Sequence, residues 1–267
     1  MFRKILLPTY GKELEDHILK YVAHVFPFSK FYVVSVVETR TEGVHLTRIL
    51  KKKLEEHAIE AIDHAIEVLK KEGIDVEEKE ILYGDPSKEI VSYAKENGLN
   101  LIAFRCSPRE LPSFRMGRTV ENVLKKTKIP VLLIREEVKD KKIEKILLPT
   151  DGTHGSQNAE NVAIDLALSF NARITAVYVS KTDADFNEKV LKNIEWKCRQ
   201  RKIEIEVVHK KGEPAEEILN EIKDHDIIVI GAGRKGFFSN IVIGHVSRTV
   251  AAMSTIPLIL VRGRYNL

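Results

Sequence analysis

The hexapeptide Lys4-Ile-Leu-Leu-Pro-Thr9 occurs twice in the chain, because Lys145-Ile-Leu-Leu-Pro-Thr150 repeats it letter for letter. Two further pairs of similar segments follow in the same order in both halves. They are Tyr83-Gly-Asp-Pro-Ser-Lys-Glu-Ile90 with Lys211-Gly-Glu-Pro-Ala-Glu-Glu-Ile218, and Lys128-Ile-Pro-Val-Leu-Leu-Ile-Arg135 with Thr255-Ile-Pro-Leu-Ile-Leu-Val-Arg262. Such a repeat predicts one fold written twice. We expect two domains, residues 1–138 and 143–267, held close together by the short charged linker Glu136-Glu-Val-Lys-Asp-Lys-Lys142.

Within each half, short apolar runs alternate with helical patterns. The strands expected in the first half are 4–8, 31–37, 76–82, 101–104 and 131–134, with a long helix at 46–72. In the second half we expect strands at 146–149, 173–179, 203–209, 226–230 and 258–261, and helices at 156–170, 184–201, 214–224 and 244–253. Continuous Val, Ile and Leu strands that alternate with helices predict a parallel sheet covered on both faces. Each half should therefore be a doubly wound α/β sandwich, with ligands bound beyond the carboxyl ends of the strands.

Composition narrows the class of protein. The 267 residues include 43 Lys or Arg, 39 Asp or Glu and two cysteines, for a net charge of +4. This excludes collagen-like, disulfide-scaffold and disordered chains, and it predicts no nucleic-acid partner. Cys106 and Cys198 have no metal-binding or redox spacing, so we expect reduced thiols. No apolar stretch is long enough for a signal peptide or a membrane span, which predicts a soluble, cytoplasmic protein with no membrane partner.

The Gly-Asp-Pro and Gly-Glu-Pro segments have a local structural interpretation. Proline suits a first helical turn, and the acid before it can accept hydrogen bonds from free amides there. We expect Asp85 and Glu213 to cap helices rather than to take part in catalysis.

Two segments of the second half could carry chemistry at the strand ends. Pro149-Thr-Asp151-Gly-Thr153 follows the first strand, where Asp151 could accept from a ribose hydroxyl or an adenine amine. The alternative is that Asp151 or Thr153 only caps the next helix. Gly231-Ala-Gly233-Arg-Lys-Gly236 follows the fourth strand and leads to Gly244-His-Val-Ser247 at a helix start, a pattern that favours phosphate binding over a plain surface loop.

The first half differs at both places. Tyr10 stands where the second half has Asp151, and an arginine-proline loop replaces the glycines. The helix-start glycine, Gly117, is kept. Four arginines of this segment could hold an anion, although a solvated loop is the simpler interpretation: Arg105, Arg109, Arg115 and Arg118. We expect a degenerate nucleotide site in this half.

The motifs together resemble the universal stress protein family in its tandem-domain form. The segments that carry the resemblance are Ile146-Leu-Leu-Pro-Thr-Asp-Gly-Thr153, Gly212-Glu-Pro-Ala-Glu-Glu-Ile218, and Ile230-Gly-Ala-Gly-Arg-Lys-Gly236 followed by Gly244-His-Val-Ser247. The resemblance covers nearly the whole chain. It implies two three-layer sandwiches, each with a five-stranded parallel sheet of the adenine nucleotide alpha hydrolase-like kind. It also implies a stress-response regulatory protein whose last strands, 131–134 and 258–261, pair in an intramolecular pseudo-dimer, with a further homodimer as an open possibility.

Many members of that family bind ATP or AMP, with or without Mg or Mn. The resemblance places the nucleotide in the second half, with Asp151 and Val179 near adenine and ribose and the glycine segment around the phosphates. The candidate binding residues are Pro149, Thr150, Asp151, Val179, Gly231, Gly233, Arg234, Gly236, Gly244, His245, Val246 and Ser247. This chain departs from the family pattern in two ways, since Arg234 stands at the middle glycine position and His245 replaces the usual hydroxyl residue.

Other function classes remain as alternatives. A dehydrogenase-like dinucleotide site would need its glycines after the first strand, and a Walker P-loop is absent. No triad, carboxylate pair or metal cluster accompanies the glycines, so slow ATP hydrolysis is the most that we expect of an enzyme. His57, Glu60 and His64 share one helical face, which suggests either a transition-metal site or a solvated surface. The last alternative is an interaction module without a nucleotide.

Overall fold

The computed structural model describes residues 2–11, 16–39, 48–106, 116–138, 142–182, 186–233 and 243–263. The first half contains strands β1 (Lys4–Pro8), β2 (Lys30–Val37), β3 (Val76–Tyr83), β4 (Leu101–Arg105) and β5 (Val131–Ile134). Its helices are α1 (Asp16–Val25), α2 (Arg48–Lys71), α3 (Pro86–Glu96) and α4 (Arg118–Lys126).

The second half repeats this order of elements. Its strands are β6 (Lys145–Pro149), β7 (Arg173–Ser180), β8 (Ile205–Lys211), β9 (Ile227–Gly231) and β10 (Leu258–Val261). Its helices are α5 (His154–Phe170), α6 (Glu188–Gln200), α7 (Pro214–Asn220), the short 3-10 helix η2 (Glu221–Asp224) and α8 (His245–Met253). The predicted strands of both halves are confirmed, with ends that shift by one or two residues.

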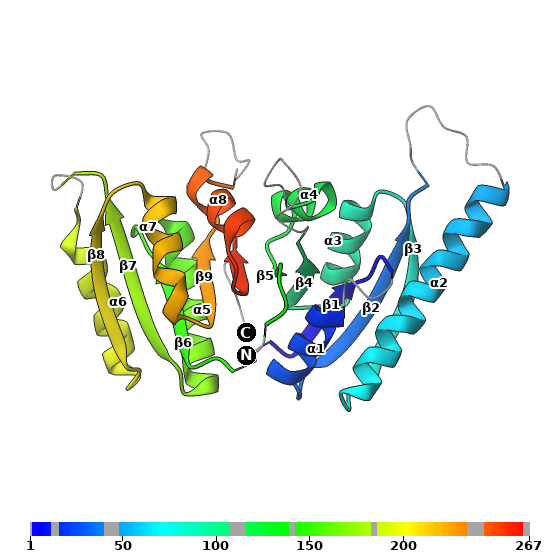
Figure 1. The fold of residues 1–267 in the computed structure, drawn as a ribbon, viewed down its shortest axis with the longest axis horizontal. Coiled ribbons are helices and arrows are strands. Elements are labelled where there is room, and N and C mark those ends of the chain that lie inside the picture. The colour runs from blue at the N-terminus through cyan, green and yellow to red at the C-terminus, as the bar shows by residue number, and fades with distance from the viewer. Residues whose placement is uncertain are drawn as a thin grey trace.

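All ten strands belong to one sheet, in the order β3-β2-β1-β4-β5-β10-β9-β6-β7-β8. The five strands of each half are parallel to one another. The halves meet where β5 and β10 pair antiparallel, with Leu132 opposite Ile259. Figure 1 shows the two halves side by side, with helices on both faces of the sheet. The predicted fold class, two doubly wound α/β sandwiches with five parallel strands each, is correct.

The inner strands bury both of their faces, because successive side chains point to opposite sides of a sheet that helices cover on both sides. Ile5 and Leu7 belong to one hydrophobic cluster, which also contains residues of α1, α2, α5 and α6. Leu6 belongs to a second cluster, with residues of α3, α4, α7 and α8. Both clusters draw residues from both halves, so the core continues across the junction.

Several helix boundaries differ from the sequence prediction, and three of the differences have a local explanation or limit. The helix predicted from Ser156 begins at His154, because the side chain of Thr153 accepts the amide of Ser156. Helix α6 begins after its cap, Asn187, and the predicted start at Ala184 lies outside the described residues. The segment predicted as one helix over 214–224 is α-helical only to Asn220 and ends in the tighter 3-10 helix η2.

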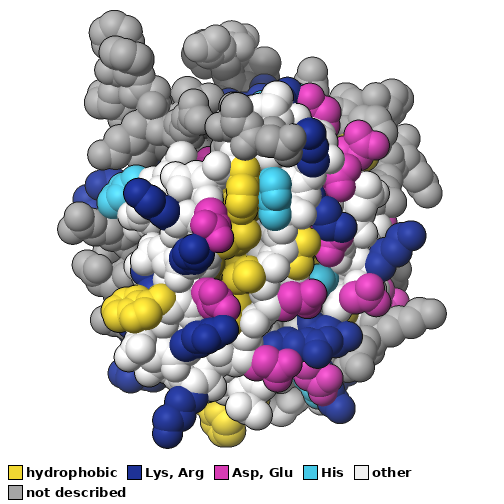
Figure 2. Space-filling model, turned by 90° about the vertical axis from the view of Figure 1, so that its left-hand side faces the viewer, with side chains coloured by type: hydrophobic (Ala, Val, Ile, Leu, Met, Phe, Trp, Pro, Cys, Tyr) yellow, Lys and Arg dark blue, Asp and Glu magenta, His cyan; other side chains and the backbone are white. Residues whose placement is uncertain are grey.

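The outer edge of the second half is β8, and Figure 2 looks onto that end of the molecule. A short strip of hydrophobic side chains lies there among Lys, Arg, Asp and Glu. The strand itself contributes the half-exposed Val207 and the flanking charges Glu206, Lys210 and Lys211. Charged residues of this kind keep a sheet edge from pairing with another strand. Among the helices that the structure describes, none is long and apolar enough to cross a membrane.

Candidate functional site

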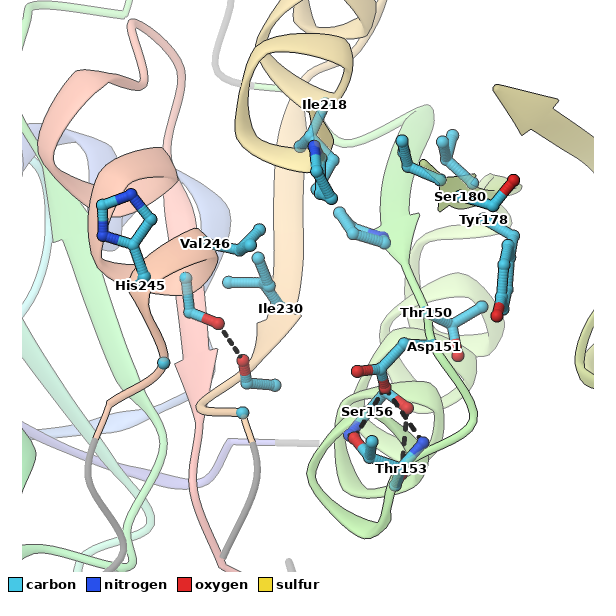
Figure 3. Close-up of a pocket in the computed structure, with 18 of the residues that line it drawn as sticks. Thr150, Asp151, Thr153, Ser156, Tyr178, Ser180, Ile218, Ile230, His245 and Val246 are labelled. Atoms are coloured by element: carbon cyan, nitrogen blue, oxygen red, sulfur yellow. Dashed lines mark hydrogen bonds between the residues drawn. The ribbon is translucent and has the colours of Figure 1, made fainter. Parts of the chain in front are cut away.

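The second half has a topological switch between β6 and β9. From β6 the chain continues outward to β7 and β8, and it then returns to form β9 on the other side of β6. Ligands of open α/β sheets bind at such a switch, beyond the carboxyl ends of the strands. A cavity of about 760 Å³ lies there, and Figure 3 shows it from close by.

The cavity is lined by the ends of three strands and the starts of three helices. Its lining residues are Pro149, Thr150, Asp151, Thr153, Ser156, Val177, Tyr178, Val179, Ser180, Lys181, Pro214, Ile218, Ile230, Gly231, Gly233, Ile243, Gly244, His245, Val246 and Ser247. All the candidate binding residues that the structure describes are in this set. Arg234 and Gly236 lie outside the described residues.

The turn after β6 presents Asp151 to the cavity while it starts the next helix. Asp151 Oδ1 accepts from the amide of Thr153 at 2.9 Å and from its hydroxyl at 2.6 Å. Thr153, not Asp151, is the cap of α5. Oδ2 of Asp151 has no hydrogen-bond partner among the described residues, so one carboxylate oxygen can accept from a ligand while the other fixes the turn.

The glycines at this site allow backbone segments to pack closely against one another. A Cβ on Gly231 would lie 2.5 Å from the carbonyl carbon and oxygen of Gly155, at the start of α5. Gly233 has φ +94°, and a Cβ there would lie 3.0 Å from Gly244 Cα. The sequence suggested glycines for phosphate approach, but Gly231 is also required for β9 to pass α5. Gly155, the partner in this contact, was not predicted.

The start of α8 offers amide donors rather than side chains. The amides of His245, Val246 and Ser247 have no acceptor among the described residues, as expected for a first helical turn. Ser247 is a candidate binding residue, but its hydroxyl donates to the carbonyl of Gly231 at 2.6 Å. The imidazole of His245 is exposed and turned away from Asp151 in Figure 3, so its contribution to the cavity is the backbone.

The apolar wall of the cavity was mostly missed by sequence reasoning. Val177, Ile218, Ile230 and Ile243 line it together with Val179, which was predicted. The sequence could have indicated Val177, because Val177 and Val179 lie two residues apart and therefore share one face of β7. Contacts from α7 and from Ile243 depend on the fold and leave no motif in the sequence.

Lys181, at the end of β7, is a further unpredicted residue of the cavity rim. Its ammonium lies 2.6 Å from Glu213 Oε1. Glu213 therefore makes no side-chain cap to α7, contrary to our prediction. Asp85 does cap α3, because its Oδ1 accepts the amide of Lys88 at 2.9 Å.

The switch point of the first half has different chemistry. Tyr10 stands at the position of Asp151 and is 81% exposed. Arg105 occupies the position of Gly231, since it pairs with the end of β5 as Gly231 pairs with the end of β10. Arg118 begins α4 after Gly117, and Arg109 and Arg115 lie outside the described residues. An arginine in place of the tightest glycine means that the two sites cannot be built alike.

The suggested metal site on α2 is not assembled. His57 Nε2 donates to the carbonyl of Tyr10 at 2.9 Å, whereas His64 Nε2 contacts Asp16 Oδ1 at 2.7 Å. The two histidines thus hold different segments of the chain. Among the described residues, no group of three His, Cys, Asp or Glu side chains could hold a metal ion.

The fold and the cavity define a tandem, doubly wound α/β protein with a ligand-sized site at the switch point of its second half. Residues 1–135 and 142–262 each match the model of the universal stress protein family. The chain belongs to this family, whose members are stress-response proteins, and it carries the family's domain twice.

Individual relatives agree with this two-domain arrangement. A universal stress protein of Mycolicibacterium smegmatis is 23% identical over 265 residues, which cover 90% of this chain and 89% of the relative. Universal stress protein YxiE of Bacillus subtilis is 28% identical over 145 residues, 44% of this chain and 98% of the relative, so it corresponds to one half. The crystal structure of a universal stress protein from Archaeoglobus fulgidus has a TM-score of 0.81 at 21% identity, covering 98% of this chain and 96% of that chain.

Proposed function

We propose that the second half binds one adenine nucleotide, ATP or AMP, and that the chain is a nucleotide-responsive regulatory protein of the stress response. The observation that carries the proposal is the cavity, which combines an available carboxylate oxygen, an apolar wall and unpaired helix-start amides. Its volume of about 760 Å³ is in the range of small-molecule sites. We assign the cavity to a second domain, for which we propose the bounds 143–267.

In this proposal each part of the cavity has a chemical role. The apolar side chains of β7, β9 and α7 cover the base, and Asp151 Oδ2 accepts from the ribose hydroxyls. Phosphate oxygens accept from the amides of His245, Val246 and Ser247, where the helix dipole favours negative charge. An Mg or Mn ion would enter the cavity bound to the phosphates of a triphosphate. Asp151 is the one acidic side chain among the described residues that line the cavity.

We also infer that residues 1–138 form a domain that has lost this site. The exposed Tyr10 and the arginine at position 105 support the loss. The antiparallel pairing of β5 with β10 supports an intramolecular pseudo-dimer of the two domains.

Isothermal titration of the full chain with ATP, AMP and NAD tests the proposal. We expect ATP or AMP to bind with a stoichiometry near one, and Asp151→Ala to weaken binding about tenfold or more, as expected for loss of a charged hydrogen bond. Tyr10→Ala, at the equivalent position of the first half, is the matched control and should leave affinity unchanged. If no nucleotide produces binding heat, an interaction module without a nucleotide remains as the function. A stoichiometry near two would contradict the loss of the first site. Steady release of phosphate from ATP would favour the slow hydrolase.

A further inference from the structure

Helix α6 is linked to the Asp151 turn at two points, once by direct contact and once through the side chain of another helix. On one side, a Cβ on Gly152, which has φ +74°, would lie 2.6 Å from Val190 Cγ2. On the other side, Lys197 reaches Thr150 through a buried carboxylate. The turn that presents Asp151 is thus held at both ends by contacts that lead to a helix outside the cavity lining.

The carboxylate is that of Glu160 on α5. The Thr150 hydroxyl donates to Glu160 Oε1 at 2.8 Å, and the Lys197 ammonium donates to Oε2 at 2.8 Å. The Glu160 side chain is 1% exposed and that of Lys197 is 23% exposed. Both carboxylate oxygens therefore have a partner, one on the site turn and one on α6.

Stability is a poor explanation for this arrangement. Removing a carboxylate and an ammonium from water costs about as much as their attraction returns, and buried pairs can often be replaced by apolar residues without loss of stability. Helix α6 also has a solvent-exposed ion pair, Glu188 with Lys192, in which both side chains are about two-thirds exposed. What distinguishes the buried pair is its fixed geometry and its contact with a residue of the cavity.

We propose that Glu160 and Lys197 are positioning residues, which hold Thr150 and thereby set the orientation of Asp151 toward a ligand. Lys197 fixes the Glu160 carboxylate, Glu160 fixes the Thr150 hydroxyl, and the backbone passes directly from Thr150 to Asp151. The effect on ligand affinity rests on the proposed function, but the effect on the turn does not.

The first half holds the equivalent turn by other means. There α2 contacts it through His57, which donates to the Tyr10 carbonyl at 2.9 Å and lies against Gly11. The turn that carries Asp151 is thus held by a buried carboxylate, which is itself linked to the helix after the second strand of that half. The turn that carries Tyr10 is instead bound directly by a side chain of α2.

The decisive variant replaces both members of the pair, Glu160→Leu with Lys197→Met. Because it leaves no buried charge behind, it should unfold within a few degrees of the wild type, with the lost acceptor of the Thr150 hydroxyl as the main cost. The Thr153 amide, which donates to Asp151 Oδ1, should exchange its hydrogen about tenfold faster, since the turn has lost one anchoring hydrogen bond. The dissociation constant for ATP or AMP should rise by about tenfold for the same reason.

Glu188→Gln with Lys192→Met is the matched control on the same helix, and it should change neither exchange nor affinity. Thr150→Val provides a second variant that keeps the ion pair, and it should also speed exchange at Thr153, even if the double replacement does not fold. Unchanged exchange at Thr153 in the variants that fold would overturn the proposal. If the wild type binds no nucleotide, the proposed function fails while the exchange rates still decide the positioning role.

Discussion

Asp85 and Glu213 occupy equivalent positions before a proline, but their carboxylates make different contacts. Asp85 accepts from the Ser87 hydroxyl at 2.5 Å and from the Lys88 amide at 2.9 Å, and Lys126 lies nearby. These contacts, that of Ser87 above all, lower the pKa of Asp85 from 3.8 to about 2. Glu213 instead pairs with Lys181, and both of these side chains are largely exposed. The same sequence motif thus gives a helix cap in one half and a surface ion pair in the other.

Alanine at the two positions should therefore have unequal effects. Asp85→Ala should lower the free energy of unfolding by about 1 kcal/mol, the usual cost of losing a cap, and Glu213→Ala by less than about 0.5 kcal/mol. Because the folded state lowers the pKa of Asp85, its contribution is complete above about pH 4 and disappears as the pH falls toward 2. Urea unfolding at pH 7 and pH 3 measures both effects, and equal losses at pH 7 would contradict the assignment.

Both cysteines are sealed inside the protein. Cys106 and Cys198 are free and buried, and burial raises the pKa of each thiol to about 11. The reactive thiolate is therefore scarce at neutral pH. We expect no reaction with a thiol reagent at pH 8 in the folded protein and two reacting thiols after unfolding. Rapid labelling of the folded protein would show that the structure opens locally after β4, at Cys106, or in α6, at Cys198.

At the scale of elements, much of the fold could be predicted, because strand positions follow from local apolar runs. The runs at 131–134 and 258–261 gave the correct strands, and the doubly wound fold followed from the alternation of strands and helices. Long-range contacts could not be predicted in the same way. Nothing in the spacing of Glu160 and Lys197 indicates that they meet, since 37 residues separate them and the packing of α6 against β7 and β8 decides the contact.

Two glycines at the site look alike in the sequence, but only one of them is required by close backbone packing. Gly231 has no room for a Cβ, because the backbone of Gly155 would be 2.5 Å away, whereas at Gly244 the nearest atom would be Gly233 Cα at an ordinary 3.5 Å. Gly231→Ala should therefore cost about 1–3 kcal/mol of unfolding free energy through overpacking. Gly244→Ala is the matched control and should stay within about 0.5 kcal/mol of the wild type. Chemical denaturation followed by circular dichroism compares them, and equal stabilities would mean that β9 and α5 can move apart.

At the scale of the whole molecule, the charges on the strands indicate which edges pair. The outer strand β3 contains Glu77, Glu78, Lys79 and Glu80, and the outer strand β8 also bears charges. In contrast, β5 reads Val-Leu-Leu-Ile and β10 reads Leu-Ile-Leu-Val, and both are fully buried. Uncharged apolar edges require a partner strand, whereas charged edges discourage one. We therefore expect the strands themselves, rather than the linker, to set the junction of the two halves.

Separating the halves tests this argument. A relative that corresponds to one half exists as a chain of its own, so a fragment of residues 142–267 should fold. Its β10 edge would lack β5, and we expect β10 to pair antiparallel with a second copy, giving twice the fragment mass in light scattering at micromolar concentration. Ile259→Lys places a charge opposite the position that Leu132 occupies in the full chain, and it should keep the fragment monomeric. A monomeric fragment without this substitution would mean that the buried edge does not drive the association, and that the linker alone keeps the two halves together.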